Sequence, residues 1–355
     1  MSVLFKSPSN NNVSIGGSNK GFPPGDISNI SYRVDNQKIL IKWQDPDDTI
    51  IDGITLSKWK GTLLIRNNDH YPTSIKDGDV VIDNTIRNKY KDIFYEDIGL
   101  INDHMYYYRF FVYSEDNVYN DSSNLVFKDK PLSFAPILKD NTWEQIIAAC
   151  ESNSIPSTWK IGDEIDLTLS GEFNETVTMQ IWDFNHFDKS DGSGKANICF
   201  GMKNLMSTEQ QMNLSNTNIG GWNNTHIRND VMINVFNCIP LELSSYIKEI
   251  NTYANKGGQF FSSQICRDKV FLPGYKEIGF ATENYDGNQY KFPIFTDRIS
   301  RIKYINGQQR GNYWWTRSPY TENKQNFRYL DELGTDQYTH NYSTASMGIC
   351  FCFNI

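Results

Sequence analysis

Residues 100–112 read Leu100-Ile-Asn-Asp-His-Met-Tyr106-Tyr-Tyr-Arg-Phe-Phe-Val112 and contain the clearest strand pattern of the chain. From Tyr106 to Val112, every second residue is aromatic or aliphatic, so that in an extended backbone these side chains would share one face. The pattern predicts a strand that packs one face on a core. Leu100 stands six residues before Tyr106.

The surrounding residues, from about Asp26 to Phe127, predict more short strands separated by turn-forming residues. Short strands at regular spacing with turns between them are typical of an all-β sandwich. The predicted strands are Lys38–Trp43, Gly61–Arg66, Val80–Asp83 and Tyr90–Asp97. We therefore expect one all-β domain over residues 25–130, preceded by a flexible leader or docking arm at residues 1–24.

A Trp on an early strand, Trp43, and the Leu100…Tyr106 corner resemble a fibronectin type III domain. The resemblance implies that the Tyr106 hydroxyl ties its strand back to the preceding loop. More narrowly, four segments are similar to modules in the tail proteins of phages that infect low-GC Gram-positive bacteria. These segments are Trp43-Gln44-Asp45-Pro46, Trp59-Lys60-Gly61-Thr62, Lys76-Asp77-Gly78-Asp79 and Tyr106-Tyr107-Tyr108-Arg109.

Residues 131–355 predict a second, α+β domain with an antiparallel sheet. Thr142 is a suitable N-cap for an amphipathic helix from Trp143 to Cys150. Two strands, Glu164–Leu169 and Thr176–Trp182, are expected to follow. A second helix is predicted from Asn224 to Phe236 and a third within Leu241 to Asn255, before a tail of strands and loops.

Five ordered segments of this half resemble a bacterial and phage domain of unknown function, the family numbered 6273. The resemblance implies a C-type-lectin-like fold related to formylglycine-generating enzymes. The chain departs from the family at its end, where Gly348-Ile349-Cys350-Phe351-Cys352-Phe353 lacks the usual Arg. The five segments are Trp159–Asp163, Asp183–Ala196, Gly221–Arg228, Lys269–Glu277 and Tyr313–Pro319.

Composition and charge exclude several classes of partner. The 355 residues include 34 basic and 42 acidic side chains, a net charge of −8, which argues against nucleic acid or an anionic membrane as the main partner. We find 38 Asn and 7 Ala, a balance that favours strands and ordered loops over helices. No secretory signal or membrane-spanning apolar run is apparent, so we expect synthesis in a cytoplasm without membrane insertion. Six scattered cysteines predict reduced, mostly buried thiols.

The candidate ligand contacts fall into two groups. Trp222 and Trp314, with Arg228 and Arg317 nearby, combine aromatic faces with fixed hydrogen-bond donors, which suit a glycan or peptide ligand; a role in the core and in buried ion pairs is the stronger interpretation. The better candidates lie in two loops in which aromatic residues alternate with small polar ones, as in antibody paratopes. They are Tyr320, Asn323 and Asn326 within Tyr320–Asn326, and Tyr338, His340 and Tyr342 within Asp336–Ser343.

Metal and catalytic signals are poor. Asp183, Asn185, Asp188 and Asp191 supply four oxygen ligands within a short stretch, so calcium has to be considered, but their spacing is not that of an EF-hand and turn formation is favoured. We expect no cofactor and no catalytic residues. Cys350 and Cys352 are the nearest approach to the reactive pair of a formylglycine-type oxidase, and packing in the core is the favoured interpretation.

These observations lead to one leading hypothesis and two alternatives. The leading one is a non-enzymatic receptor-binding or tail-fibre protein of a phage or phage-tail-like particle. Its C-terminal domain would recognise a bacterial cell-surface glycan or surface protein, and its N-terminal region would attach to other tail or baseplate proteins, in a particle that contains it as a homo-oligomer, expected to be a trimer. The alternatives are a structural baseplate component without a host ligand, and a cell-wall hydrolase or formylglycine-type oxidase.

Overall fold

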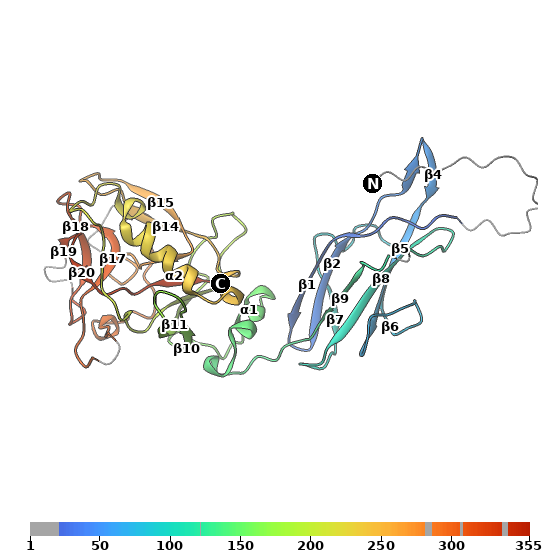
Figure 1. Cartoon of the computed structure of the whole chain (residues 1–355), viewed down its shortest axis with the longest axis horizontal. Helices are drawn as coiled ribbons and strands as arrows, with labels where there is room; N and C mark the ends of the chain where they lie inside the picture. Colours follow the sequence, from blue (N-terminus) through green and yellow to red (C-terminus); the bar gives the residue numbers. More distant parts are fainter. Residues whose placement is uncertain (1–20, 121, 281–285, 306–307, 336–339) are drawn as a thin grey trace, which may run out of the picture. The chain divides into compact units, whose positions relative to one another are not determined.

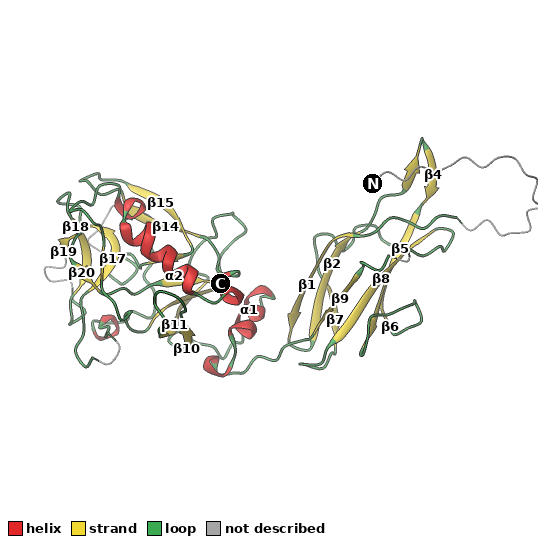
Figure 2. Cartoon of the chain, in the orientation of Figure 1, coloured by secondary structure: helices red, strands yellow, loops and turns green. Residues whose placement is uncertain are grey.

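The computed structural model describes residues 21–120, 122–280, 286–305, 308–335 and 340–355. The chain divides into two compact units, Met1–Pro131 and Leu132–Ile355 (Figure 1). Both consist mainly of antiparallel sheets and loops, and the few helices belong to the second unit (Figure 2). None of the helices in the described ranges is long and apolar enough to cross a membrane.

The first unit contains two sheets and a separate hairpin, all antiparallel. One sheet has the order β1-β2-β7, the other β6-β5-β8-β9, and β3 pairs with β4 in the hairpin. The strands are β1 Ser28–Asp35, β2 Lys38–Gln44, β3 Thr49–Ile51, β4 Ile54–Ser57, β5 Trp59–Asn67, β6 Asp79–Asn84, β7 Tyr95–Ile98, β8 Tyr106–Ser114 and β9 Val126–Asp129. The predicted strands at residues 38–43, 61–66, 80–83 and 106–112 are thus confirmed within one or two residues.

The core of the first unit contains the residues that the sequence singled out. Trp43 and Tyr108 are fully buried in one apolar cluster, and the backbone N–H of Ile101 donates a hydrogen bond of 3.0 Å to the Tyr106 hydroxyl. The predicted link between Tyr106 and its preceding loop is therefore confirmed. The strand predicted for Tyr90–Asp97 is wrong over its first half, because residues 90–94 form turns and only Tyr95–Ile98 pairs with β2.

The second unit is built around a five-stranded antiparallel sheet of order β10-β11-β12-β21-β16. Smaller sheets are formed by β13 with β20, by β14 with β15, and by β17-β18-β19. The elements are η1 Leu138–Asp140, α1 Trp143–Glu151, β10 Glu164–Thr168, β11 Thr176–Phe184, β12 Ile198–Met202, β13 Gln210–Gln211, η2 Gly221–Asn224, η3 Ile227–Val231, α2 Met232–Cys238, α3 Leu241–Ser244, β14 Ile250–Asn255, β15 Ser263–Asp268, β16 Val270–Phe271, η4 Ile299–Arg301, β17 Trp314–Pro319, β18 Asn326–Leu330, β19 His340–Tyr342, β20 Ser346–Met347 and β21 Cys352–Asn354.

Short-range sequence patterns predicted the helices of this unit but not a strand that depends on pairing with a distant segment. Thr142 caps α1 through a reciprocal pair of hydrogen bonds with Gln145, as predicted. The helix predicted within residues 241–255 is confirmed as α3, which ends at Ser244, and the later residues Ile250–Asn255 form the strand β14, whose even-numbered residues are buried. The helix predicted at 224–236 begins a few residues later, with the π-helical turn η3 leading directly into α2. All six cysteines are buried and unpaired, as expected.

Candidate recognition surface

The three-stranded sheet β17-β18-β19 brings most of the predicted loop residues together. Asn326 pairs with Tyr342 and Arg328 with His340 across β18 and β19. Side chains two residues apart on a strand share a face, so Asn326, Arg328, His340 and Tyr342 lie on one side of this sheet. The chain between β17 and β18, residues 320–325, borders the same edge. Tyr338 lies outside the described residues.

The buried side chain of Asn218 holds the loop of residues 320–325 in place. Its fully buried side-chain amide donates to the backbone carbonyls of Tyr320, Asn323 and Asn326 at 3.1, 3.0 and 2.8 Å. The Asn218 Oδ1 accepts a hydrogen bond of 2.8 Å from the Gly258 N–H. One buried side chain therefore satisfies several backbone groups of a loop that has no regular secondary structure of its own.

Asn323 and Asn326 act inside the loop. The Asn323 Oδ1 accepts from the backbone N–H groups of Gln325 and Asn326, both at 2.9 Å. Asn326 is 8% exposed, and its Nδ2 donates to the His340 Nδ1 at 2.8 Å. These two residues were predicted as ligand contacts, and in the structure their polar atoms shape the loop and orient His340.

A series of contacts between aromatic rings and guanidinium groups links this loop to the sheet and to segments outside it. The Tyr320 ring stacks on His340, with centroids 3.9 Å apart and planes 3° from parallel. The guanidinium carbon of Arg328 lies 4.5 Å from the Tyr320 ring centroid and 5.0 Å from that of Tyr275. Tyr275 stacks on Phe280 at 4.6 Å, and Arg301 lies 4.5 Å from Phe280. We call these six residues the stacked row.

The stacked row is only partly covered. Tyr275 is 1% exposed and anchors the row in the core, while Tyr320, Arg328 and His340 are half-buried. Tyr342, next to His340 on the same strand face, is 54% exposed. Guanidinium groups over aromatic faces and stacked rings stabilise one another by about 0.5–1.5 kcal/mol per contact, so the rings are held in place before any ligand arrives.

Charge around His340 favours its neutral form. Burial and the nearby Arg328 guanidinium both lower the pKa of His340 below its usual value, against the weaker effect of the Glu322 carboxylate. The Asn326 amide nitrogen can only donate, so Nδ1 of His340 accepts and the ring proton of the neutral form sits on Nε2. The surface therefore presents a neutral imidazole, a phenol and a fixed guanidinium, groups that bind hydroxyls and flat or anionic groups.

Trp222 and Trp314 do not belong to this surface. Both are fully buried, and their indole N–H groups are used internally: Trp222 donates to the Asp268 carboxylate at 3.1 Å and Trp314 to the Arg301 carbonyl at 3.1 Å. Neither ring has a face open to a ligand, so as contact residues both are corrected to core residues. Arg317 is also fully buried and pairs with Glu277 through both terminal nitrogens.

The four oxygen ligands considered for calcium do not converge. The Asp183 carboxylate binds His186 Nδ1 at 2.7 Å, Asp188 lies 3.4 Å from Lys195 Nζ, and Asp191 accepts from the Ser193 N–H at 2.8 Å. Asn185 adopts a left-handed φ of 54°, as in a turn. Within the described part of the chain, no group of three His, Cys, Asp or Glu side chains is placed to hold a metal ion.

Comparison with known proteins assigns a family to the region that carries this surface. Residues 197–355 match the family model described as Domain of unknown function (DUF6273). No curated protein matches the chain. The matched region includes the sheet β17-β18-β19, the residue Asn218 and all six members of the stacked row.

The sequence predicted two members of the stacked row, Tyr320 and His340, and missed the other four. Arg328 stands two residues after the candidate Asn326, so alternation would have placed both on one face had the strand Asn326–Leu330 been predicted. Tyr275, Phe280 and Arg301 come from distant segments with no pattern that links them to Tyr320. Asn218 is one of 38 asparagines, and only the fold distinguishes it.

Proposed function

We propose that this protein is a receptor-binding or tail-fibre protein of a phage or phage-tail-like particle. Its second unit recognises a bacterial cell-surface glycan or surface protein, and its first unit spaces and attaches it to other tail or baseplate proteins. The observation that carries the proposal is the stacked row with the exposed Tyr342 beside it. Fixed aromatic and polar side chains on an ordered loop suit recognition because little conformational entropy is lost on binding.

We further propose a fibronectin type III-like fold for the first unit and a C-type-lectin-like fold for the second. The buried Trp43 and the hydrogen bond from Ile101 to the Tyr106 hydroxyl support the first assignment. The DUF6273 match over residues 197–355 supports the second through the resemblance described above. A trimer is proposed because several weak sites that bind together raise avidity without new contacts.

Binding of the labelled full-length chain to intact low-GC Gram-positive cells and to their purified walls tests the proposal. We expect binding that increases when the chain is multimerised on a scaffold, and that falls at least tenfold for Tyr342→Ala. The matched control is Tyr246→Ala, which removes another exposed tyrosine, 41% accessible, of the same unit. The molar mass of the purified protein in solution, measured by light scattering, reports whether the chain forms a trimer.

The outcomes separate the alternatives. If no binding occurs at any multivalency, the recognition proposal fails and a structural role in the baseplate takes its place. If Tyr342→Ala and Tyr246→Ala lose equal affinity, the stacked row is not the contact surface. If sugars or peptides are released from the walls, the protein is an enzyme.

A further inference from the structure

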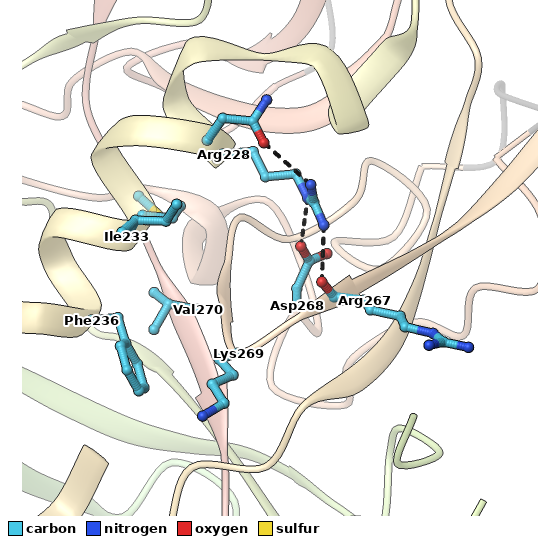
Figure 3. A pocket seen from close by; sticks show the side chains of 9 residues that line it. Arg228, Ile233, Phe236, Arg267, Asp268, Lys269 and Val270 are labelled. Carbon is cyan, nitrogen blue, oxygen red and sulfur yellow. Dashed lines mark hydrogen bonds and ion pairs between the residues drawn. The ribbon is translucent and has the colours of Figure 1, made fainter. Parts of the chain in front are cut away.

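A hollow in the second unit, separate from the stacked row, lies between the segment η3–α2 and the strands β15 and β16. It has a volume of about 240 Å³, enough for one terminal residue of a ligand rather than an extended chain. Figure 3 shows Arg228 and Asp268 at one end, Lys269 at the other, and the side chains of Ile233, Phe236 and Val270 along it. It shares no residue with the stacked row.

Arg228 is held in a fixed position at its end of the hollow. Its Nε donates to the Asp268 carboxylate at 2.7 Å, and its Nη2 donates to the Arg267 carbonyl at 2.9 Å. Nη1 makes a longer contact of 3.3 Å to Asn229 Oδ1. Each terminal nitrogen carries two hydrogens, so each keeps one donor without a partner among the described residues. The Arg228 side chain is 22% exposed and lines the hollow.

The Asp268 charge is already balanced and does not repel an anion strongly. Asp268 is 5% exposed and accepts hydrogen bonds from Trp222 Nε1 and Thr252 Oγ1 in addition to Arg228. At the other end, Lys269 has no carboxylate partner among the described residues; its ammonium lies 4.8 Å from the Phe236 ring centroid. The hollow is therefore locally cationic in a chain of net charge −8.

The wall between Arg228 and Lys269 is mainly aliphatic, and its one aromatic ring is covered by the Lys269 ammonium. Val270 and Met232 are buried beneath it, and Ile233 of α2 is 53% exposed beside it. Phe236 supplies the ring in the wall, and the Lys269 ammonium lies over that ring. A sugar ring needs an open aromatic face on which to stack, whereas a short aliphatic side chain needs only apolar surface.

From this geometry we propose that the hollow binds a terminal carboxylate that carries a short aliphatic side chain, as at the C-terminal residue of a peptide. The carboxylate accepts hydrogen bonds from the two remaining donors of Arg228, with Lys269 adding positive charge. The aliphatic group packs on Ile233 and Val270. The peptide stems of bacterial walls and the C-termini of proteins both offer this chemistry, and their stereochemistry distinguishes them. This inference goes beyond the proposed function, because it does not require the stacked row to bind anything.

The test is calorimetric titration of the full-length chain with N-acetyl-Ala-Ala as the free acid and as the C-terminal amide, each in the L,L and D,D forms. We expect the acid to bind at least tenfold more tightly than the amide. A preference for D,D indicates a wall-type stem as the source, and a preference for L,L indicates a protein C-terminus.

Ile233→Glu should lower the affinity for the acid at least tenfold, because a carboxylate on the exposed wall repels the ligand's own. Leu241→Glu is the matched control, since Leu241 is an aliphatic residue of the same unit that is 76% exposed and does not line the hollow. Near-ultraviolet circular dichroism verifies that both variants are folded.

Three results would overturn the inference: no binding of the acid at millimolar concentration, equal binding of acid and amide, or equal losses for the two Glu variants. Displacement of the dipeptide by an equal concentration of inorganic phosphate would show an unselective anion site and would overturn it too. Tyr342→Ala separates the two proposals, because it should leave dipeptide binding unchanged whatever it does to cell binding.

Discussion

Replacement of Asn218 by Ala tests whether one buried amide holds the loop of residues 320–325 in shape. The side chain donates two hydrogens that three carbonyls share, and it accepts one hydrogen bond from Gly258. A net contribution of about 1 kcal/mol per hydrogen bond gives about 3 kcal/mol for the three hydrogens involved. Alanine leaves all four backbone groups without these bonds, so Asn218→Ala should lower the free energy of unfolding of the second unit by about 3 kcal/mol.

Urea denaturation followed by tryptophan fluorescence measures this loss. Six of the eight tryptophans lie in the second unit, so its transition dominates the signal. Asn216→Ala is the matched control, because Asn216 is exposed two residues earlier in the same segment, and its free energy of unfolding should change by no more than about 0.5 kcal/mol. Cell binding should fall for Asn218→Ala and persist for Asn216→Ala.

The result for Asn218→Ala can refute the reasoning in two ways. A loss below about 1 kcal/mol would mean that water or a rearranged loop replaces the Asn218 bonds at no cost. The predicted loss of about 3 kcal/mol together with undiminished cell binding would mean that the loop, although held by Asn218, is not the contact surface. Either outcome separates the structural role of the residue from the proposed recognition.

Three further predictions concern stability. Arg317→Leu leaves the fully buried Glu277 carboxylate without its partner, so urea denaturation should show a loss of about 3–5 kcal/mol, whereas the double replacement with Glu277→Leu should recover part of it. Because the pKa of His340 is lowered in the folded state, the unfolded chain takes up a proton first, at its ordinary pKa near 6.5; stability should therefore fall as the pH falls through and below that value, and His340→Phe should flatten this part of the urea–pH profile. Tyr106→Phe removes the acceptor of the Ile101 N–H and should cost the first unit about 1 kcal/mol, with an unchanged circular dichroism spectrum.

The fold was predictable where a residue's own neighbours determine its conformation. The alternation from Tyr106 to Val112 predicted a strand, and Thr142 before the apolar residues of Trp143–Cys150 predicted a helix start, because both signals are local. The strand Ile250–Asn255 was not predicted, because only its pairing with Ser263–Asp268 makes it a strand. The strand prediction for Tyr90–Asp97 was only partly right: its apolar residues suit a strand, but residues 90–94 form turns.

The candidate site was predictable only in part, because the fold brings its residues together from segments that are far apart in the sequence. Tyr320 and His340 were chosen for their loop chemistry, and the structure stacks them face to face. Nothing in the sequence links Tyr320 to Tyr275, which stands 45 residues earlier; in the structure the Arg328 guanidinium lies over both rings. Asn326 was chosen as a contact, whereas its amide orients His340.

The burial of Trp222, Trp314 and Arg317 argues against these residues as contacts in the proposed recognition. These residues belong to the segments that carry the resemblance to the family, and each is fully buried with its polar group bonded internally. Such residues preserve a fold and leave the ligand undetermined. The exposed residues on and beside the stacked row lie outside those segments, so a change at Tyr342 should alter what is bound without loss of stability, whereas a change at Arg317 should do the reverse.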